Sequence, residues 1–256
     1  MALVGDLVHK LNPGPDQANN YHHLNHSTGN PIVTSQIAVC SRSPVSKQKG
    51  ANLHNLYYLK PANFNVCKTL RFCTWNAQVV RNKTAVIQDY LCHEKIDLCA
   101  ITESWMKTKD TAVRAERTPS GYSIADFPRP VRSAGGIAII YRSTLKLAKV
   151  NTGVKTSFEF AEHLVSSGTD KLRMVVMYRT PYSQVQRVNI STFLDEFADY
   201  MEPTINTSEP LLITGDINIH VDVPDDPNII RFLDLLDSMG LVQHVKTPTH
   251  KMGHTG

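Results

Sequence analysis

From residue 70 onward, short apolar runs alternate with segments of helical period. Runs rich in β-branched and aromatic residues predict strands at 70–75, 97–102, 122–127 and 136–142. Between the first two strands, one face of a helix over 84–94 carries the apolar residues Val86, Ile87, Tyr90 and Leu91. This order of strand, helix and strand predicts the start of a layered α/β domain.

The second half of the chain continues with closely spaced strands and two helices. Three strands are predicted at 145–150, 158–165 and 172–179. The short turns between them indicate antiparallel pairing. Helices are predicted over 189–201, closed by Pro203, and over 227–239, with the apolar strand 211–216 between them. We therefore predict an α/β (α+β) fold, a four-layer α-β-β-α sandwich of two mostly antiparallel sheets with outer helices.

Residues 1–65 differ from the rest of the chain in composition and in hydrophobic pattern. They are rich in Asn, His, Ser, Pro and Lys and show no sustained apolar period. We predict a disordered leader over 1–65 and a single domain over 66–256.

Composition limits the class of protein. The chain has 256 residues, 41% of them hydrophobic, and no apolar run approaches the roughly 18 to 20 residues of a membrane helix. Its start lacks the basic and apolar regions of a secretory signal. Five cysteines without a CxxC pair argue against a disulfide framework and a zinc ribbon. We expect an intracellular protein, nuclear or cytoplasmic, with reduced thiols, no membrane contact and no stable protein partner.

Charge is distributed unevenly along the chain. Residues 71–155 hold 14 basic and 7 acidic side chains, whereas residues 205–240 hold 7 acidic side chains and one basic side chain, Arg231. A basic region beside an acidic cluster suits a polyanionic substrate handled with a metal cation. Ordinary solvated surface charge is the alternative.

Polar residues follow three of the predicted strands at their ends. Asn76 and Glu103 follow the first two strands, and Asp216 ends the strand 211–216, with Asn218 and His220 at the same parity. Strand ends are the recurrent location of active sites in α/β proteins. Carboxylates such as these suit Mg²⁺, with Mn²⁺ as an alternative. Each residue taken alone is equally compatible with a turn or helix cap.

The ordered motifs TWNAQ, ITESW, GGIAIIYR, VVMYRTP and ITGDINIHVD resemble the endonuclease/exonuclease/phosphatase superfamily. More narrowly, they resemble the endonuclease at the start of the polyprotein of LINE-type (non-LTR) retrotransposons. The resemblance covers roughly residues 68–256. It implies DNA as the substrate and, in a full element, a reverse-transcriptase domain in cis.

The resemblance assigns roles to five residues. It makes Glu103 the direct metal ligand and Asn76 a second metal-site residue. It makes Tyr178 a phosphate-facing phenol and Asp216 the carboxylate that orients or deprotonates the attacking water. It makes Asn218 the amide that holds the scissile phosphate.

The family pattern continues beyond PTHKMGHT to a closing Ser-Asp-His element, which these 256 residues do not contain. The resemblance therefore implies a domain whose last strands are missing, with an unpaired sheet edge and little or no activity. Two further interpretations are a catalytically silent nucleic-acid-binding remnant and a phosphatase or phospholipase of the same superfamily.

A weaker resemblance lies at the start of the chain. Gly5-Asp6 and the later sequence Asn12-Pro13-Gly14-Pro15 resemble a 2A-like translational-skipping peptide. The spacing differs from that of the motif, and an ordinary turn explains the same residues.

Overall fold

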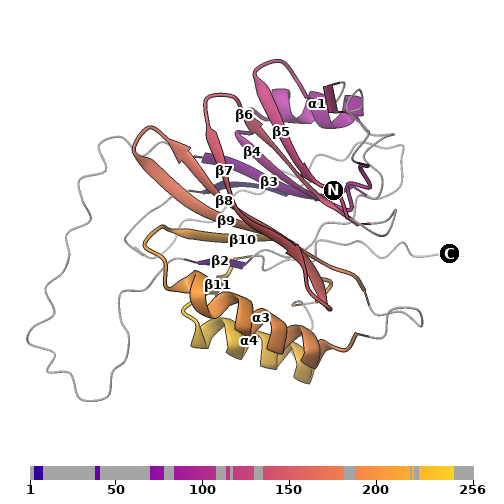
Figure 1. The fold of residues 1–256 in the computed structure, drawn as a ribbon, viewed down its shortest axis with the longest axis vertical. Helices are drawn as coiled ribbons and strands as arrows, with labels where there is room; N and C mark the ends of the chain where they lie inside the picture. The colour runs from indigo at the N-terminus through magenta and orange to yellow at the C-terminus, as the bar shows by residue number, and fades with distance from the viewer. Residues whose placement is uncertain are drawn as a thin grey trace, which may run out of the picture.

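The computed structural model describes residues 3–7, 38–40, 70–77, 84–107, 114–115, 118–129, 135–181, 188–219, 221 and 225–244. Within them, two sheets pack face to face, with one helix outside the first sheet and two helices outside the second (Figure 1). The predicted four-layer α-β-β-α sandwich is thus confirmed.

The first sheet has the strand order β1-β3-β4-β6-β5. Its strands are β1 (Leu3–Leu7), β3 (Leu70–Asn76), β4 (Leu98–Thr102), β5 (Tyr122–Phe127) and β6 (Ile137–Arg142). Helix α1 (Thr84–His93) connects β3 to β4, which run parallel, and the other neighbours pair antiparallel. A parallel pair needs such a crossover, which explains the predicted order of strand, helix and strand.

The second sheet has the order β11-β2-β10-β9-β8-β7. Its strands are β2 (Ala38–Cys40), β7 (Lys146–Val154), β8 (Phe158–Ser167), β9 (Asp170–Arg179), β10 (Leu211–Asp216) and β11 (Val242–Gln243). Helix α3 (Ile190–Ile205) connects the parallel strands β9 and β10, and α4 (Pro227–Ser238) follows β10. The remaining neighbours are antiparallel, so each sheet is mixed with a majority of antiparallel pairs.

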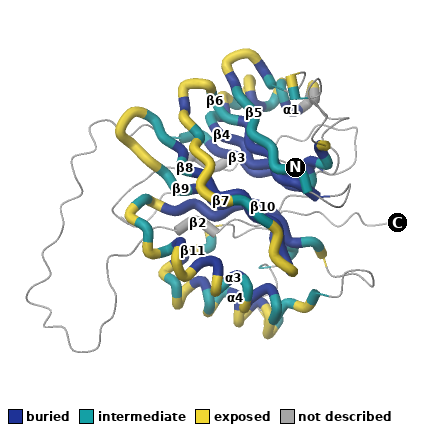
Figure 2. Tube along the Cα trace, viewed as in Figure 1, coloured by how far each residue is buried: buried dark blue, intermediate teal, exposed yellow. Residues whose placement is uncertain are grey.

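Alternation along the strands produces three apolar layers. In β3, Phe72 faces the second sheet, whereas Cys73 and Trp75 face α1. Between the sheets, Phe72 shares a buried cluster with Val176 and Leu212. Figure 2 shows the resulting pattern, with buried central strands and with exposed residues on the outer faces of the helices, on β7 and at the turns that connect strands. The burial of both faces explains why a strand such as β10 begins with three consecutive apolar residues, Leu211 to Ile213.

Helix α3 departs from its predicted end. It continues through Pro203 to Ile205 rather than stopping before the proline. Proline disrupts a helix mainly by removing a donor and crowding the preceding turn. Here the next turn is held by burial of Thr204, whose hydroxyl donates to the Tyr200 carbonyl at 3.0 Å. The contact of this turn with the sheet therefore outweighs the local signal of the proline.

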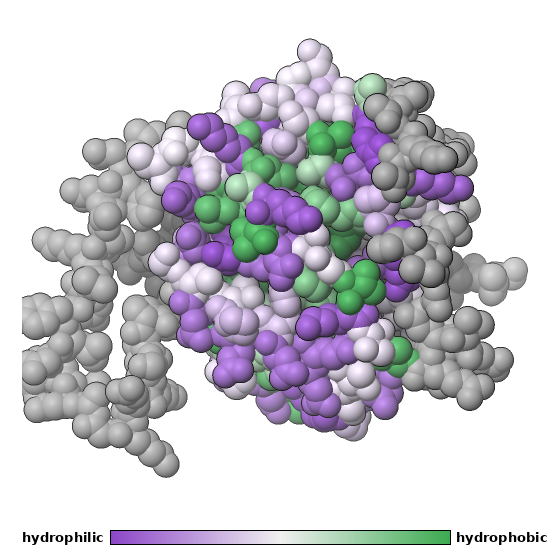
Figure 3. Space-filling view, viewed as in Figure 1, coloured by the Kyte–Doolittle hydropathy of each residue, from purple (hydrophilic) through white to green (hydrophobic). Residues whose placement is uncertain are grey.

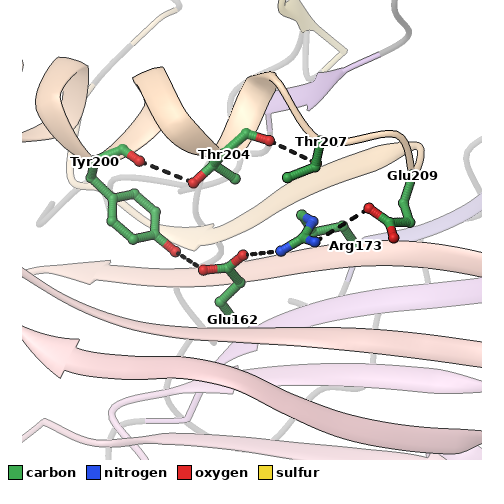
Figure 4. A network of polar contacts seen from close by, with 6 residues as sticks. All are labelled: Glu162, Arg173, Tyr200, Thr204, Thr207 and Glu209. Atoms are coloured by element: carbon green, nitrogen blue, oxygen red, sulfur yellow. Dashed lines mark hydrogen bonds and ion pairs between the residues drawn. The ribbon is translucent and has the colours of Figure 1, made fainter.

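A buried network of polar contacts joins α3 to the second sheet (Figure 4). The Glu162 carboxylate on β8 accepts from the Tyr200 hydroxyl at 3.0 Å and from the Arg173 guanidinium at 2.5 Å. Arg173 also donates to Glu209 at 3.2 Å. Glu162 is 5% exposed, so its charge depends on these partners. The network fixes the helix relative to β8 and β9.

Strand β7 forms the free edge of the second sheet. It exposes Lys146, Lys149 and the apolar residues Val150 and Val154, and its register with β8 shifts between Lys149 and Asn151. Figure 3 shows hydrophobic and hydrophilic residues mixed over the middle of this face. Lysines and an irregular register are features that limit pairing of an exposed edge with another chain.

Two short strands lie within the predicted leader. β1 pairs with β3, and β2 pairs with β10 between residues 211 and 213. β2 therefore covers one side of β10 over these residues. The sequence Asn12-Pro13-Gly14-Pro15 and most of the leader lie outside the described residues, so the leader stays a prediction.

We expect limited proteolysis of the full chain to cut first within residues 1–65 and to leave a core that begins near residue 66. The reason is that the leader has too little apolar surface to offset the entropy of ordering. Mass spectrometry of the fragments measures the boundary. Protection of β1 and β2 together with the core would instead assign the leader to the domain.

His163 makes folding sensitive to pH. Its side chain is 1% exposed, between the sheets and 4.9 Å from the Phe127 ring. Burial lowers the pKa of His163 to about 4, Lys149 acts in the same direction, and a hydrogen bond with Ala161 opposes both. The unfolded chain, with a histidine pKa of about 6.5, therefore binds the proton more readily than the folded chain between pH 4 and 6.5.

Stability is accordingly expected to fall as the pH drops from about 6.5 to 4, by up to about 3 kcal/mol from this residue. Urea unfolding across this range, compared with His163→Phe, measures the contribution. The variant should show a flatter pH dependence. Identical curves for the two proteins would contradict the assignment.

Candidate active site

The carboxyl-terminal ends of four strands meet at one edge of the two sheets. Asn76 and Glu103 come from β3 and β4 of the first sheet, and Tyr178 and Asp216 from β9 and β10 of the second. Asn76 is the last residue of its strand, as is Asp216, whose partner in the register is Tyr178. Parallel pairing within each sheet places these ends together, as expected for an α/β site.

The Asn76 amide connects the two sheets directly. Its Nδ2 donates to Glu103 Oε1 at 2.8 Å and to Asp216 Oδ2 at 2.5 Å. Asn76 and Asp216 are each 2% exposed. Two carboxylates thus converge on one donor group at a nearly dry position, where like charges repel strongly. The arrangement is suited to a cation.

Tyr178, on β9 of the second sheet, contacts the Glu103 carboxylate. Its phenol is buried and hydrogen-bonds Glu103. Burial raises the pKa of Tyr178 well above its ordinary value, and the negative charge of Glu103 raises it further. The hydroxyl therefore keeps its proton as a hydrogen-bond donor. The structure brings Tyr178 to the predicted site with this donor directed to Glu103.

Beyond Asp216 the chain does not continue in the extended conformation that the alternating pattern predicts. Asn218 has a φ of 48°, and its backbone N–H donates to Asp216 Oδ1 at 3.1 Å. Ile217 and Ile219 are drawn into the apolar layer beneath the helices, which bends the path. Asn218 still lies beside Asp216, whereas His220 lies outside the described residues.

Gly215 permits the close approach of β10 to β9. Its φ is +127°, and a Cβ atom there would overlap the backbone of Met177. No residue with a side chain fits this position without moving one of the strands. The Gly-Asp sequence therefore sets the position of Asp216 against Tyr178.

Sequence reasoning missed Arg179, which fixes the turn after Asp216. Arg179 is 5% exposed, and its guanidinium donates to the carbonyls of Ile217 and Asn218 at 3.3 and 3.2 Å. In return, Asn218 Nδ2 donates to the Arg179 carbonyl at 2.5 Å. Burial lowers the pKa of Arg179 and the charge of Asp216 opposes this shift. A cationic residue directly after Tyr178 at the end of an apolar strand was the available signal.

Glu159 is a second residue that sequence reasoning missed. It lies on β8 beside Tyr178 in the register and is 4% exposed. Its carboxylate is paired with Arg129 at 3.1 Å. Burial raises the pKa of Glu159, although Arg129 and the Gly136 N–H counteract the shift. The signal was a charged residue between Phe158 and Phe160 in a predicted strand.

Comparison with known proteins identifies the family. A sequence profile of the Endonuclease/Exonuclease/phosphatase family matches residues 73–250, which include all five predicted site residues. The chain belongs to this family. No curated protein sequence gives a significant match.

Comparison with solved structures finds matches of low sequence identity. An AP endonuclease from Leishmania major is 14% identical with a TM-score of 0.51, and the match covers 66% of each chain. The endonuclease domain of a telomere-specific non-LTR retrotransposon is 13% identical with a TM-score of 0.47, covering 69% of this chain and 74% of that one. The catalytic domain of human Nocturnin is 16% identical with a TM-score of 0.46, covering 67% and 74%.

The site of this family member fits a hard divalent cation. Members of the endonuclease/exonuclease/phosphatase family generally use such ions. Glu103 and Asp216 supply carboxylate oxygens and Asn76 an amide group at one point. Among the described residues, no group of three or more His, Cys, Asp and Glu side chains is arranged to hold a metal ion, so the two carboxylates here would be completed by the amide and by water. A small set of oxygen ligands suits Mg²⁺, which usually keeps several of its waters.

A separate finding concerns membranes. Within the described ranges, every helix is too short or too polar to span a bilayer.

We expect Mg²⁺ or Mn²⁺ to raise the melting temperature of the chain, because an ion that binds only the folded state stabilises it by mass action. At an ion concentration 100 times the Kd, the free energy of unfolding rises by about 2.7 kcal/mol. Glu103→Gln should abolish this rise in melting temperature. Glu162→Gln alters a buried carboxylate on the face of β8 that packs against α3, so this variant should retain the rise. Differential scanning fluorimetry measures both, and an unchanged response of Glu103→Gln would remove Glu103 from the metal site.

Proposed function

We propose that the chain is a metal-dependent phosphodiester hydrolase, a DNA-nicking endonuclease of LINE-type retrotransposon origin. The observation that carries the proposal is the Asn76 amide, which joins the carboxylates of Glu103 and Asp216 from two different sheets. Family membership supports phosphoester chemistry. The resemblance of the motifs to LINE-type endonucleases, from TWNAQ to ITGDINIHVD, supports the choice of DNA.

Each residue has a chemical task in this proposal. A divalent cation at Glu103 and Asn76 supplies positive charge to the phosphate oxygens when it is bound. Asp216 orients or deprotonates the attacking water, and its own orientation is fixed by donors from Asn76 and from the backbone of Asn218. Asn218 contributes the amide N–H that is not given to the Arg179 carbonyl, and Tyr178 contributes its hydroxyl once the cation takes its place at Glu103.

The charge distribution supports a polyanionic substrate. Basic residues outnumber acidic ones by 14 to 7 between residues 71 and 155, which include β3 to β7 and the ligand Glu103. An excess of basic residues in this part of the chain favours binding of nucleic acid through its phosphates, with an affinity that falls as salt rises. A reverse-transcriptase domain in cis is the partner expected in a full element.

We further propose that the 256 residues nick DNA slowly. They do not contain the closing Ser-Asp-His element of the family pattern. A general acid or base typically contributes about 10² to 10⁴-fold to a rate. The residues that bind the metal and position water are nevertheless present, so a low rate that depends on Asp216 is expected.

The test is nicking of supercoiled plasmid in Mg²⁺ at low salt. Asp216→Ala should reduce nicking to background, whereas Asp237→Ala, which removes an exposed carboxylate on α4, should not. Added imidazole should raise the rate of the unchanged chain by supplying the missing acid/base group. Nicking that is insensitive to Asp216→Ala would contradict the proposed site.

The same preparation separates the two alternatives. DNA binding in a gel-shift assay, without nicking under any of these conditions, would favour a silent nucleic-acid-binding remnant. Hydrolysis of a small phosphoester, without plasmid nicking, would favour a phosphatase or phospholipase.

A further inference from the structure

The backbone around Glu103 adopts an uncommon conformation. Glu103 has a φ of 51° and Trp105 a φ of 49°, both in the left-handed region that residues with side chains rarely adopt. Such a conformation persists only where surrounding contacts impose it. The contacts that impose this backbone conformation must therefore be made by residues 103–105 or their neighbours.

Gly135 and Gly136 provide these contacts. The N–H of Ser104 donates to the Gly136 carbonyl at 3.1 Å, and the N–H of Trp105 donates to the Gly135 carbonyl at 3.0 Å. Both glycines have positive φ values, +100° and +85°. The glycine pair thus holds the two residues that follow Glu103 and so orients Glu103 itself.

The glycine pair is in turn held by Glu159. The Gly136 N–H donates to Glu159 Oε2 at 2.9 Å, and the other carboxylate oxygen pairs with Arg129 at 3.1 Å. A Cβ atom on Gly135 would lie 2.5 Å from Glu159 Oε1, and one on Gly136 would lie 2.9 Å from Ser104 Oγ. The pair is therefore enclosed between Glu159 on one side and Ser104 on the other.

We propose that Glu159 is a positioning residue, which acts through Gly135 and Gly136 to hold Glu103 in the orientation required for metal binding. The proposal rests on the proposed function of Glu103 as a metal ligand. Glu159 lies on β8 of the second sheet, whereas Glu103 follows β4 of the first sheet. The contact chain therefore couples metal affinity to the packing of one sheet against the other.

The neighbouring residue Glu162 offers a matched control on the same strand. It is 5% exposed and paired with an arginine, as Glu159 is, but it faces helix α3. Removing either carboxylate breaks a buried ion pair, yet only Glu159 contacts the glycine pair. Gly121 is the matching control for Gly136, because its φ is +82° and nothing lies within 4 Å of a Cβ atom placed there.

The experiment measures the dissociation constant for Mn²⁺ by electron paramagnetic resonance of the free ion, using the full chain. Glu159→Ala and Gly136→Ala should each weaken Mn²⁺ binding by about 10-fold or more, the typical effect of losing a residue that orients a metal ligand. Glu162→Ala and Gly121→Ala should have dissociation constants for Mn²⁺ within about threefold of that of the unchanged chain, a difference clearly smaller than the roughly 10-fold effect. Circular dichroism confirms that each variant is folded.

Glu159→Gln distinguishes positioning from a direct effect of charge. The glutamine retains an oxygen that accepts from Gly136 but has no negative charge, so Mn²⁺ affinity should be largely restored relative to Glu159→Ala. Restoration is a result that general destabilisation would not give. If Glu159→Ala does not fold, Glu159→Gln and Gly136→Ala still provide the comparison.

Three results would overturn the inference. These are unchanged Mn²⁺ affinity in Gly136→Ala, an equal loss in the two control variants, and a full loss in Glu159→Gln. Absence of Mn²⁺ binding by the unchanged chain would instead reject the proposed function of the site, and the inference with it.

Discussion

The site depends on an amide that spans the space between two sheets. Asn76 belongs to the first sheet, and its side chain donates both to Glu103 of that sheet and to Asp216 of the other. A buried carboxylate without a partner is strongly unfavourable, so the sheets are constrained to pack with these strand ends in register. The apolar layer between the sheets supplies the attraction, and the polar contact at its end selects the alignment.

Much of this arrangement follows from local patterns in the sequence. The apolar runs predict the strands from β3 to β10 but not β11, because a strand buried on both faces is recognisable from its composition whereas β11 has only two residues. The same runs place Asn76, Glu103 and Asp216 at strand ends. Helix α4 begins at Pro227, as predicted, with the Asp226 side chain accepting from the Asn228 N–H.

Other features depend on contacts between distant parts of the chain. The turn at Asn218 is set by Arg179, 39 residues away in sequence, and Gly136 is held by Glu159, 23 residues away. The continuation of α3 through Pro203 and the pairing of β2 with β10 are likewise tertiary effects. Propensity and periodicity do not encode such contacts, so the roles of Arg179 and Glu159 became visible only in the fold.

Alternate residues of β8 serve two different purposes. Glu162 points to α3 and fixes the helical layer, while Glu159 points between the sheets to the glycine pair. Both are buried acids that form an ion pair with an arginine. Their surroundings differ because they lie on opposite faces of the strand. One strand thus carries an anchor for the outer layer and a support for the site.

The close contact at Gly215 has a consequence for how the gene tolerates change. Every other amino acid adds at least one carbon atom where the backbone of Met177 already lies. The position therefore has no conservative replacement, unlike a buried leucine, for which similar side chains exist. Any missense change in this codon would displace the strand end that carries Asp216, even though it alters no chemical group of the site.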